Sequence, residues 1–153
     1  MKKILKFFGI LALVVAILFA GLVAFYVIDT VVLQKFTYVV NGDQETCTIT
    51  GTKYKNTLSI DIPEEIDGYT VTKIASGAFQ GHNCWTVFLP ETIEYIGEGA
   101  FADCKQLGAV HGLEDCTKLK EIQNKTFMHC YELYEIQLPE GIERIGDHAD
   151  NIA

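Results

Sequence analysis

The stretch IGEGAFADCKQL at residues 96–107 has two close copies in the same chain, IASGAFQGHNCW at residues 74–85 and IQNKTFMHCYEL at residues 122–133. Each copy has an isoleucine, a phenylalanine five positions later and a large apolar residue six positions after the phenylalanine. The three sets are Ile74, Phe79 and Trp85; Ile96, Phe101 and Leu107; and Ile122, Phe127 and Leu133. Self-similarity in a fixed register indicates a repeat architecture.

The flanking sequence also repeats, since FLPETIEYIG at 88–97 matches QLPEGIERIG at 137–146 at seven of ten positions. A unit of about 22 to 26 residues cannot bury its own apolar face and must stack on its neighbours. In LYEIQLP at 133–139, apolar residues two apart predict a short strand that Pro139 ends. The IGEGAF segment predicts a turn leading into one or two helical turns. The sequence therefore predicts an α/β repeat solenoid, with a parallel sheet on one face and short helices or turns on the other.

These residues resemble the BspA-like leucine-rich repeats of bacterial surface proteins, whose pattern is similar to IG-x-x-AF-x-x-C-x-x-L followed by a strand and LP. The resemblance runs from about Phe36 to Ile145, and it implies a right-handed superhelix of parallel strands and helices. Members of that family are mostly described as surface adhesion or interaction proteins with diverse partners. A fourth copy begins at Ile145 but has Asp150 where phenylalanine is expected. The segment DHADNIA is therefore either a minimal cap or part of a truncated array.

The chain begins with a long apolar segment. Residues 7–28 contain no charged side chain, and lysines precede them at positions 2, 3 and 6. A helix of this length would cross a hydrocarbon core of roughly 30 Å, and the positive-inside rule keeps the lysines in the cytoplasm. The alternative is a cleaved signal peptide, whose apolar region is normally only about 7 to 15 residues long.

The predicted organisation is that of a single-pass cell-membrane protein. It comprises a cytoplasmic basic tail at residues 1–6, a transmembrane signal anchor at 7–28, a linker at 29–35 and an extracellular leucine-rich-repeat domain at 36–153, with truncation of that domain left open. The chain has a formal net charge of −8, and setting aside the three lysines of the tail leaves −11 for the exported part. Such acidity argues against nucleic acid or anionic lipid headgroups as partners.

The sequence has no recognisable catalytic motif. Its two serines, Ser59 and Ser76, do not lie in G-x-S-x-G, and its 13 glycines do not form a phosphate-binding loop. We therefore expect no enzymatic activity, no cofactor and no metal.

The exported part contains five cysteines, an odd number that cannot pair completely within one chain. They are Cys47, Cys84, Cys104, Cys116 and Cys130. His82, Cys104 and Cys130 each follow a repeat phenylalanine by three positions, so stacking would place them in a row at strand spacings of about 4.8 Å. We interpret this row as core packing, because free cysteine behaves as a small buried hydrophobe. A Cys104–Cys130 disulfide and a metal site are the alternatives.

Function is expected on the outward side of the strands. The repeat phenylalanines could form an aromatic binding stripe, but their fixed distance from the isoleucines favours a buried stack. The residues that flank the central apolar residue of each strand point away from the core. They are Ser59, Asp61, Thr86, Phe88, Ala109, His111, Glu121, Gln123, Glu135 and Gln137. An aromatic residue such as Phe88 within a polar rim suits protein recognition.

We predict a protein partner on a host or envelope surface, bound through Thr86, Phe88, Ala109, His111, Glu121, Gln123, Glu135 and Gln137. The alternative is a structural role in the envelope, with self-association through the edge of the repeat array.

Overall fold

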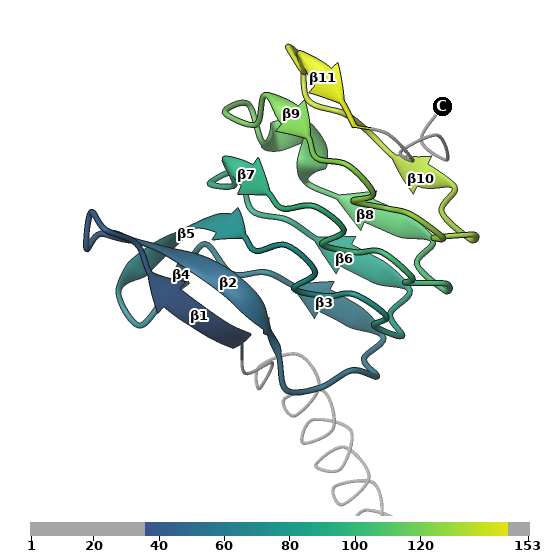
Figure 1. Ribbon diagram of the computed structural model, residues 1–153, viewed down its shortest axis with the longest axis horizontal. Coiled ribbons are helices and arrows are strands. Elements are labelled where there is room, and N and C mark those ends of the chain that lie inside the picture. Colours follow the sequence, from purple (N-terminus) through teal and green to yellow (C-terminus); the bar gives the residue numbers. More distant parts are fainter. Residues whose placement is uncertain (1–35, 147–153) are drawn as a thin grey trace, which may run out of the picture. The chain divides into compact units, whose positions relative to one another are not determined.

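A computed structural model describes residues 36–146, which are coloured in Figure 1. The predicted cytoplasmic tail, membrane anchor and linker lie outside the described residues, as do residues 147–153. Within residues 36–146 there is no helix that is long and apolar enough to cross a lipid bilayer.

The described part begins with an antiparallel hairpin. Strand β1 (Phe36–Val40) pairs with β2 (Thr46–Thr52). The hairpin turn is held by Asp43, whose Oδ1 atom accepts hydrogen bonds from the backbone N–H groups of Glu45 and Thr46, both at 3.0 Å. The ring of Phe36 packs edge-on against Phe79, with 6.2 Å between the ring centroids. The hairpin therefore covers one end of the core that the repeats form.

Four short parallel strands form the first ladder of the repeats. In chain order they are β3 (Ser59–Asp61), β6 (Thr86–Phe88), β8 (Ala109–His111) and β10 (Glu135–Ile136). Neighbouring strands in the ladder are also successive in this order, and all the pairings are parallel. Ile60, Val87 and Val110 lie opposite one another and are at most 1% exposed, so they face the core. Figure 1 shows this ladder as a stack of arrows, which confirms the predicted parallel sheet.

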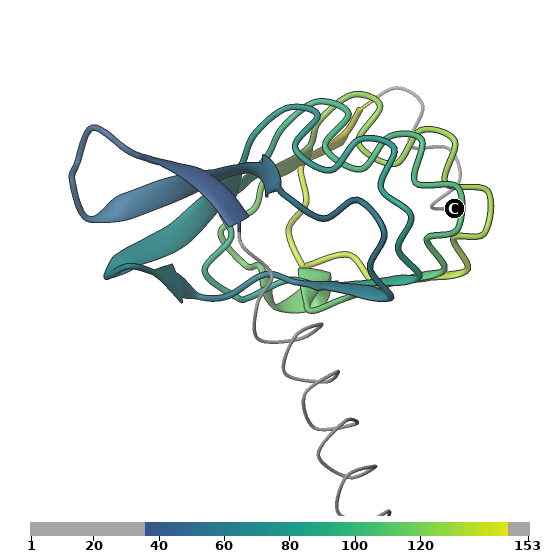
Figure 2. The same cartoon turned by 90° about the horizontal axis from the view of Figure 1, so that it is seen from below.

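A second set of parallel pairings lies across the core. Strand β5 (Tyr69–Ile74) pairs with β7 (Tyr95–Ile96), and β9 (Glu121–Ile122) pairs with β11 (Arg144–Ile145). Strand β5 also joins this set to the hairpin through β2 and is flanked by the antiparallel strand β4 (Glu65–Ile66). Ile74 lies opposite Ile96, and Ile122 lies opposite Ile145. A full coil thus contributes two strands, and in Figure 2 the successive coils lie behind one another around the core.

The segments predicted as helical turns contain no α-helix, so that part of the prediction was wrong. Within residues 36–146 the only helical element is a single 3-10 turn, Leu113–Asp115. Each turn of the repeat has two residues with positive φ, at positions 77 and 81, 99 and 103, and 125 and 129, with φ between 59° and 69°. A right-handed helix does not accommodate such residues.

Hydrogen bonding in the turns follows from this geometry. The backbone N–H of Phe79 donates to Ala100 of the next coil at 2.8 Å, whereas the N–H of Gln80 donates to Gly77 in its own turn at 3.1 Å. The same alternation recurs at Phe101 and Ala102. The turns therefore share their hydrogen bonds between neighbouring coils, which is how the backbone polar groups are satisfied without a helix.

The repeat phenylalanines form a continuous stack in the core, as predicted. Phe79, Phe101 and Phe127 are each 0% exposed. The ring centroids of the first two are 5.3 Å apart with an 8° interplanar angle, and those of the last two are 5.6 Å apart with a 5° angle. Equivalent side chains in successive coils thus have the same orientation, and each ring buries its faces against its neighbours.

Candidate functional site

The exposed surface of β3, β6, β8 and β10 is called the ladder face here, and it carries six of the eight residues predicted to bind protein. Thr86, Ala109 and Glu135 form one row across the ladder. Phe88 and His111 lie opposite each other in a second row, and Gln137 directly follows β10. Ala109 is only 5% exposed, so its side chain adds little area to this surface.

The other two predicted residues do not lie on the ladder face. Glu121 is in β9, opposite Arg144 of β11, and its carboxylate forms an ion pair with the Arg144 guanidinium. Gln123 directly follows β9. The coils through β9 each have two short strands with a buried isoleucine or valine, so the sequence around Ile122 looks like a ladder strand although it belongs to the second set.

Phe88 and His111 form an aromatic pair on the ladder face. Their ring centroids are 5.1 Å apart with an interplanar angle of 28°, and the Phe88 side chain is 45% exposed. The contact fixes both rings on adjacent strands, so a partner that buried them would lose little side-chain entropy.

The sequence reasoning missed a row of large exposed residues at the start of the same strands. Leu58, Trp85 and Tyr134 are 72%, 62% and 82% exposed, respectively. The backbone N–H of Trp85 donates to Leu58, that of Gly108 donates to Trp85, and that of Tyr134 donates to Gly108. These hydrogen bonds place the four residues in one row, with Gly108 between the two aromatic residues.

The register of the first repeat explains why Trp85 was missed. Val87 lies opposite Val110, although it is eight positions after Phe79 and Val110 is nine positions after Phe101. One residue is therefore missing from the first repeat between the phenylalanine and the strand. Cys84, which is 0% exposed, occupies the core position of Leu107, and Trp85 is displaced to the surface. Counting back from the strand valines would have placed Trp85 correctly.

Trp85 and Tyr134 line a cleft of about 330 Å³, called the aromatic cleft. Its lining residues come from three successive coils: Trp85, Thr86, Gln106, Gly108, Glu132 and Tyr134. A Cβ atom added to Gly108 would lie 2.8 Å from Cε1 of Tyr134, so the tyrosine ring leans over the glycine. The absence of a side chain at Gly108 thus keeps the floor of the cleft open.

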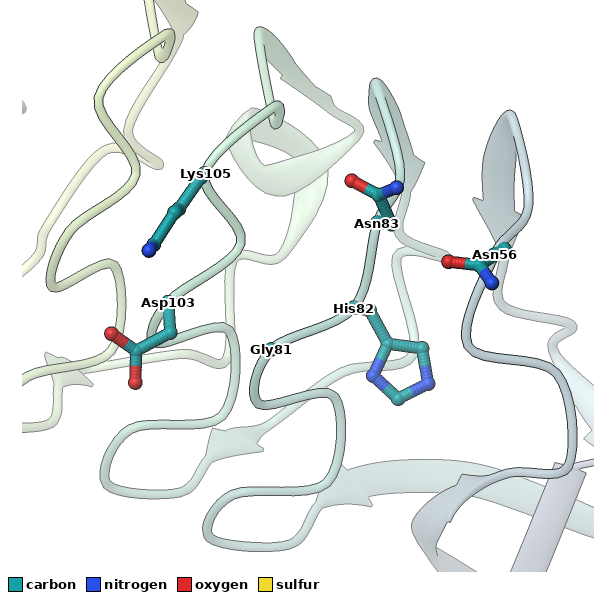
Figure 3. A pocket seen from close by; sticks show the side chains of 6 residues that line it. All are labelled: Asn56, Gly81, His82, Asn83, Asp103 and Lys105. Atoms are coloured by element: carbon teal, nitrogen blue, oxygen red, sulfur yellow. The ribbon is translucent and has the colours of Figure 1, made fainter.

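A second cavity of about 480 Å³ is lined by His82 and by residues of the adjoining coils. Figure 3 shows Asn56, His82 and Asn83 on two adjacent segments, with Asp103 and Lys105 on the next one. His82 is 4% exposed, and within the described residues neither of its ring nitrogens has a hydrogen-bond partner. Hydrogen bonds with His129 and Gln80 hold the pKa of Asp103 below its ordinary value, and the charge of Lys105 adds to this effect.

The cysteines of this row pack in the core, as predicted. The Sγ atoms of Cys104 and Cys130 donate to the carbonyl oxygens of Phe79 and Phe101 in the preceding coils, both at 3.2 Å. All five cysteines are buried free thiols, and no cluster of metal-ligating side chains occurs in the part of the chain that the structure describes. Burial raises the pKa of Cys116 and of Cys130 to about 12. These thiols are protonated at neutral pH and are not activated nucleophiles.

His82 should make the stability of the protein sensitive to mild acid. Burial lowers the pKa of His82 below its ordinary value, so the folded protein holds the neutral ring and the unfolded chain binds the proton more readily. The stability that the buried neutral ring of His82 adds to the folded protein is fully present above about pH 6.5, the ordinary histidine pKa. It is lost as the pH falls below this value. We expect urea midpoints to fall between about pH 6.5 and 5 in the parent protein. The variant His82→Cys, which introduces the residue found in the other repeats, should show a flatter profile, and identical slopes would contradict this assignment.

Comparison with known proteins gives the same repeat architecture. Residues 52–150 match the BspA type leucine rich repeat region, with six copies of the repeat. Among curated proteins, none matches this sequence. The six copies exceed the three that share the phenylalanine register.

Solved structures of other leucine-rich repeat proteins are similar to this chain. A leucine rich cell surface protein from Faecalibacterium prausnitzii is 29% identical, with a TM-score of 0.64, over 72% of this chain and 30% of that protein. A leucine-rich repeat protein from Bacteroides ovatus is also 29% identical, with a TM-score of 0.65, over 74% of this chain and 30% of that one. The leucine rich repeat protein of T. pallidum is 26% identical, with a TM-score of 0.56, over 75% and 63% of the two chains. This chain thus spans less than a third of the first two proteins.

Proposed function

Because this chain belongs to the family of BspA-type leucine-rich repeat proteins, we propose that it is a cell-surface protein that binds or adheres to another protein through its ladder face. Repeat proteins of this type are generally binding scaffolds rather than enzymes, and their extended surfaces suit partner recognition. The observation that carries the proposal is the group of exposed aromatic residues on the ladder face. Phe88 lies in β6, and Trp85 and Tyr134 directly precede β6 and β10, whose parallel pairings fix the backbone.

The composition of this surface supports protein binding. Aromatic residues dominate the energetics of protein interfaces when polar residues surround them and exclude water. Here Trp85 directly precedes β6, which contains Phe88, and Tyr134 directly precedes β10, two strands away. The polar residues Thr86 and Glu135 follow Trp85 and Tyr134 in the chain. The strands themselves, β3, β6, β8 and β10, contain acidic residues and no lysine or arginine.

Surface display is the second part of the proposal. The apolar segment at residues 7–28, preceded by lysines, would anchor the chain in the membrane and leave the repeat domain outside. A similar protein, from Faecalibacterium prausnitzii, is described as a cell surface protein. With the full chain expressed in intact bacterial cells, added protease should remove the repeat domain and leave the N-terminal segment in the membrane fraction. Protection of the repeat domain until the cells are lysed would contradict this orientation.

The ladder face can be tested with two exposed aromatic residues on different surfaces. We expect Phe88→Ser to weaken binding to a purified partner protein by more than about tenfold, because a buried aromatic anchor contributes 1.4 kcal/mol or more at an interface. Tyr95→Ser is the matched control, since Tyr95 is 40% exposed but lies in β7, outside the ladder face. The measurement is titration calorimetry with a partner identified by cross-linking to the full chain. Equal losses in both variants, or no loss in either, would count against the ladder face.

Self-association is the alternative function. Within residues 36–146, β10 and β11 each pair with a neighbour on one side only, so each leaves a strand edge that a second copy could join. Sedimentation of the full chain in detergent distinguishes the two functions. A mass that rises reversibly with concentration would favour a structural role, and a constant monomer mass would favour a different protein as partner.

A further inference from the structure

We propose that the aromatic cleft binds a cationic side chain of the partner protein, with arginine preferred over lysine. This inference deepens the proposed function and rests on it, because it names the chemistry that one part of the ladder face recognises.

The spacing of the two aromatic residues suits a cation between them. Trp85 and Tyr134 start from strands that are two positions apart in the ladder, which corresponds to roughly 10 Å between their backbones. Both side chains line the same cleft, where a cation between them is attracted to each ring whose centroid it approaches within roughly 6 Å. The lean of Tyr134 over Gly108 narrows this gap. Any side chain at position 108 would fill the space between the rings.

The charge of the cleft favours a cation. Glu132 is the one charged residue in its lining, and within the described residues its carboxylate has neither a hydrogen-bond nor an ion-pair partner. Glu135, on the adjacent strand β10, adds a second exposed carboxylate close to Tyr134 in the chain. Lys105, on the neighbouring coil, lines the second cavity instead, where its charge acts on Asp103. The carboxylate of Glu132 is thus available to a ligand.

The polar groups of the cleft favour arginine among cations. A planar guanidinium can stack on aromatic faces and donate two parallel hydrogen bonds to a carboxylate, whereas an ammonium group does neither as well. Gln106 and Thr86 line the same cleft, and the oxygen atom of each side chain is an acceptor for further N–H groups. A guanidinium has five such donors, so it can use the carboxylate and these neutral acceptors together.

The experiment uses the fluorescence of Trp85, the only tryptophan in the chain. Full-length protein in a non-ionic polyoxyethylene detergent is titrated with the capped tripeptide Gly-Arg-Gly and with the same peptide carrying neutral citrulline in place of arginine. We expect the arginine peptide to bind at least about tenfold more tightly than the citrulline peptide, which corresponds to 1.4 kcal/mol. The capped Gly-Lys-Gly peptide should bind with intermediate affinity, and added salt should weaken the binding of both cationic peptides.

Matched variants connect this binding to the cleft. Tyr134→Ala and Glu132→Gln should each reduce the affinity for the arginine peptide severalfold, while Tyr95→Ala and Glu91→Gln, which change exposed residues outside the cleft, should leave it unchanged. Equal affinity for the arginine and citrulline peptides would overturn the inference. So would binding that survives both cleft substitutions, or a fluorescence change that N-acetylglucosamine oligosaccharides produce and arginine does not.

The result also separates this inference from the proposed function. Loss of partner binding in Phe88→Ser without any preference for arginine would overturn the inference and leave the ladder face as the binding surface. A preference for arginine that depends on Tyr134 and Glu132 would support cation binding in the aromatic cleft. If Phe88→Ser left partner binding unaltered in the same protein, the rest of the ladder face would be ruled out as the binding surface.

Discussion

Replacement of Phe101 with alanine is expected to lower the free energy of unfolding by about 3–5 kcal/mol. Phe101 lies in the middle of the phenylalanine stack, with Phe79 on one face and Phe127 on the other, and none of the three is exposed. The substitution would therefore leave a cavity and remove two aromatic contacts, each of which contributes beyond its buried area. Because neighbouring coils share this stack, the loss should destabilise the whole array rather than one repeat.

The measurement is urea unfolding of the full chain in detergent, followed by circular dichroism of the strands. Phe88→Ala is the matched control, since it makes the same chemical change at a residue that is 45% exposed. We expect this control to change the unfolding free energy much less than Phe101→Ala does. If the two variants unfolded at the same urea concentration, the stacked core would not be the main source of stability.

The core was predictable because its signal is periodic. The isoleucine and phenylalanine positions recur in a fixed register, and a short repeat has nowhere to bury them except against its neighbours. The same logic placed Cys104 and Cys130 in the core, where each thiol donates a hydrogen bond to the preceding coil. Burial follows from the side-chain type and its phase, both of which are written in the sequence.

The turns were not predictable from the same signal. The segment IGEGAF contains good helix formers such as alanine and glutamate, and this composition favoured helical turns. The structure instead requires positive φ at two positions of each turn, which glycine satisfies at Gly77 and Gly99 but lysine and histidine occupy at positions 125 and 129. Since non-glycine residues fill these positions in the third copy, the glycine signal is lost there. Hydrogen bonds to the neighbouring coil decide the backbone conformation, and they depend on stacking rather than on local propensity.

The candidate site was only partly predictable, and the errors have one physical origin. Short strands with a single inward residue look alike, so Glu121 of β9 was assigned to the same sheet as Glu135 of β10. The one-residue shift in the first repeat similarly hid Trp85. Both errors concern the register between coils, and backbone pairing fixes that register only after the coils have stacked.

The second large effect is expected for Gly112→Ala, which should cost about 2–4 kcal/mol. Gly112 directly follows β8 and has φ of +79°, a conformation that costs a residue with a Cβ atom about 1 kcal/mol or more. A Cβ atom built there would lie 2.1 Å from the carbonyl oxygen of Leu89 in the preceding coil. That coil cannot move away easily, because the N–H of Leu89 donates to His111 at 2.9 Å. The crowding adds about 1–3 kcal/mol, as overpacking does in well-packed cores.

Two other glycines separate the causes of this loss. Gly68 also has positive φ, +88°, but a Cβ atom there would have no neighbour within 4 Å, so Gly68→Ala reports the backbone strain alone. Gly42 has neither positive φ nor a neighbour within 4 Å, and Gly42→Ala should be almost neutral. Urea unfolding of the three variants should therefore rank them Gly112, Gly68 and Gly42 in decreasing cost. If Gly112→Ala cost no more than Gly68→Ala, the short distance between position 112 and Leu89 of the preceding coil would not restrict the side chain at position 112. The Phe88–His111 contact would then be free to shift with its strand, and the ladder face would be less rigid than partner recognition with a preformed aromatic surface requires.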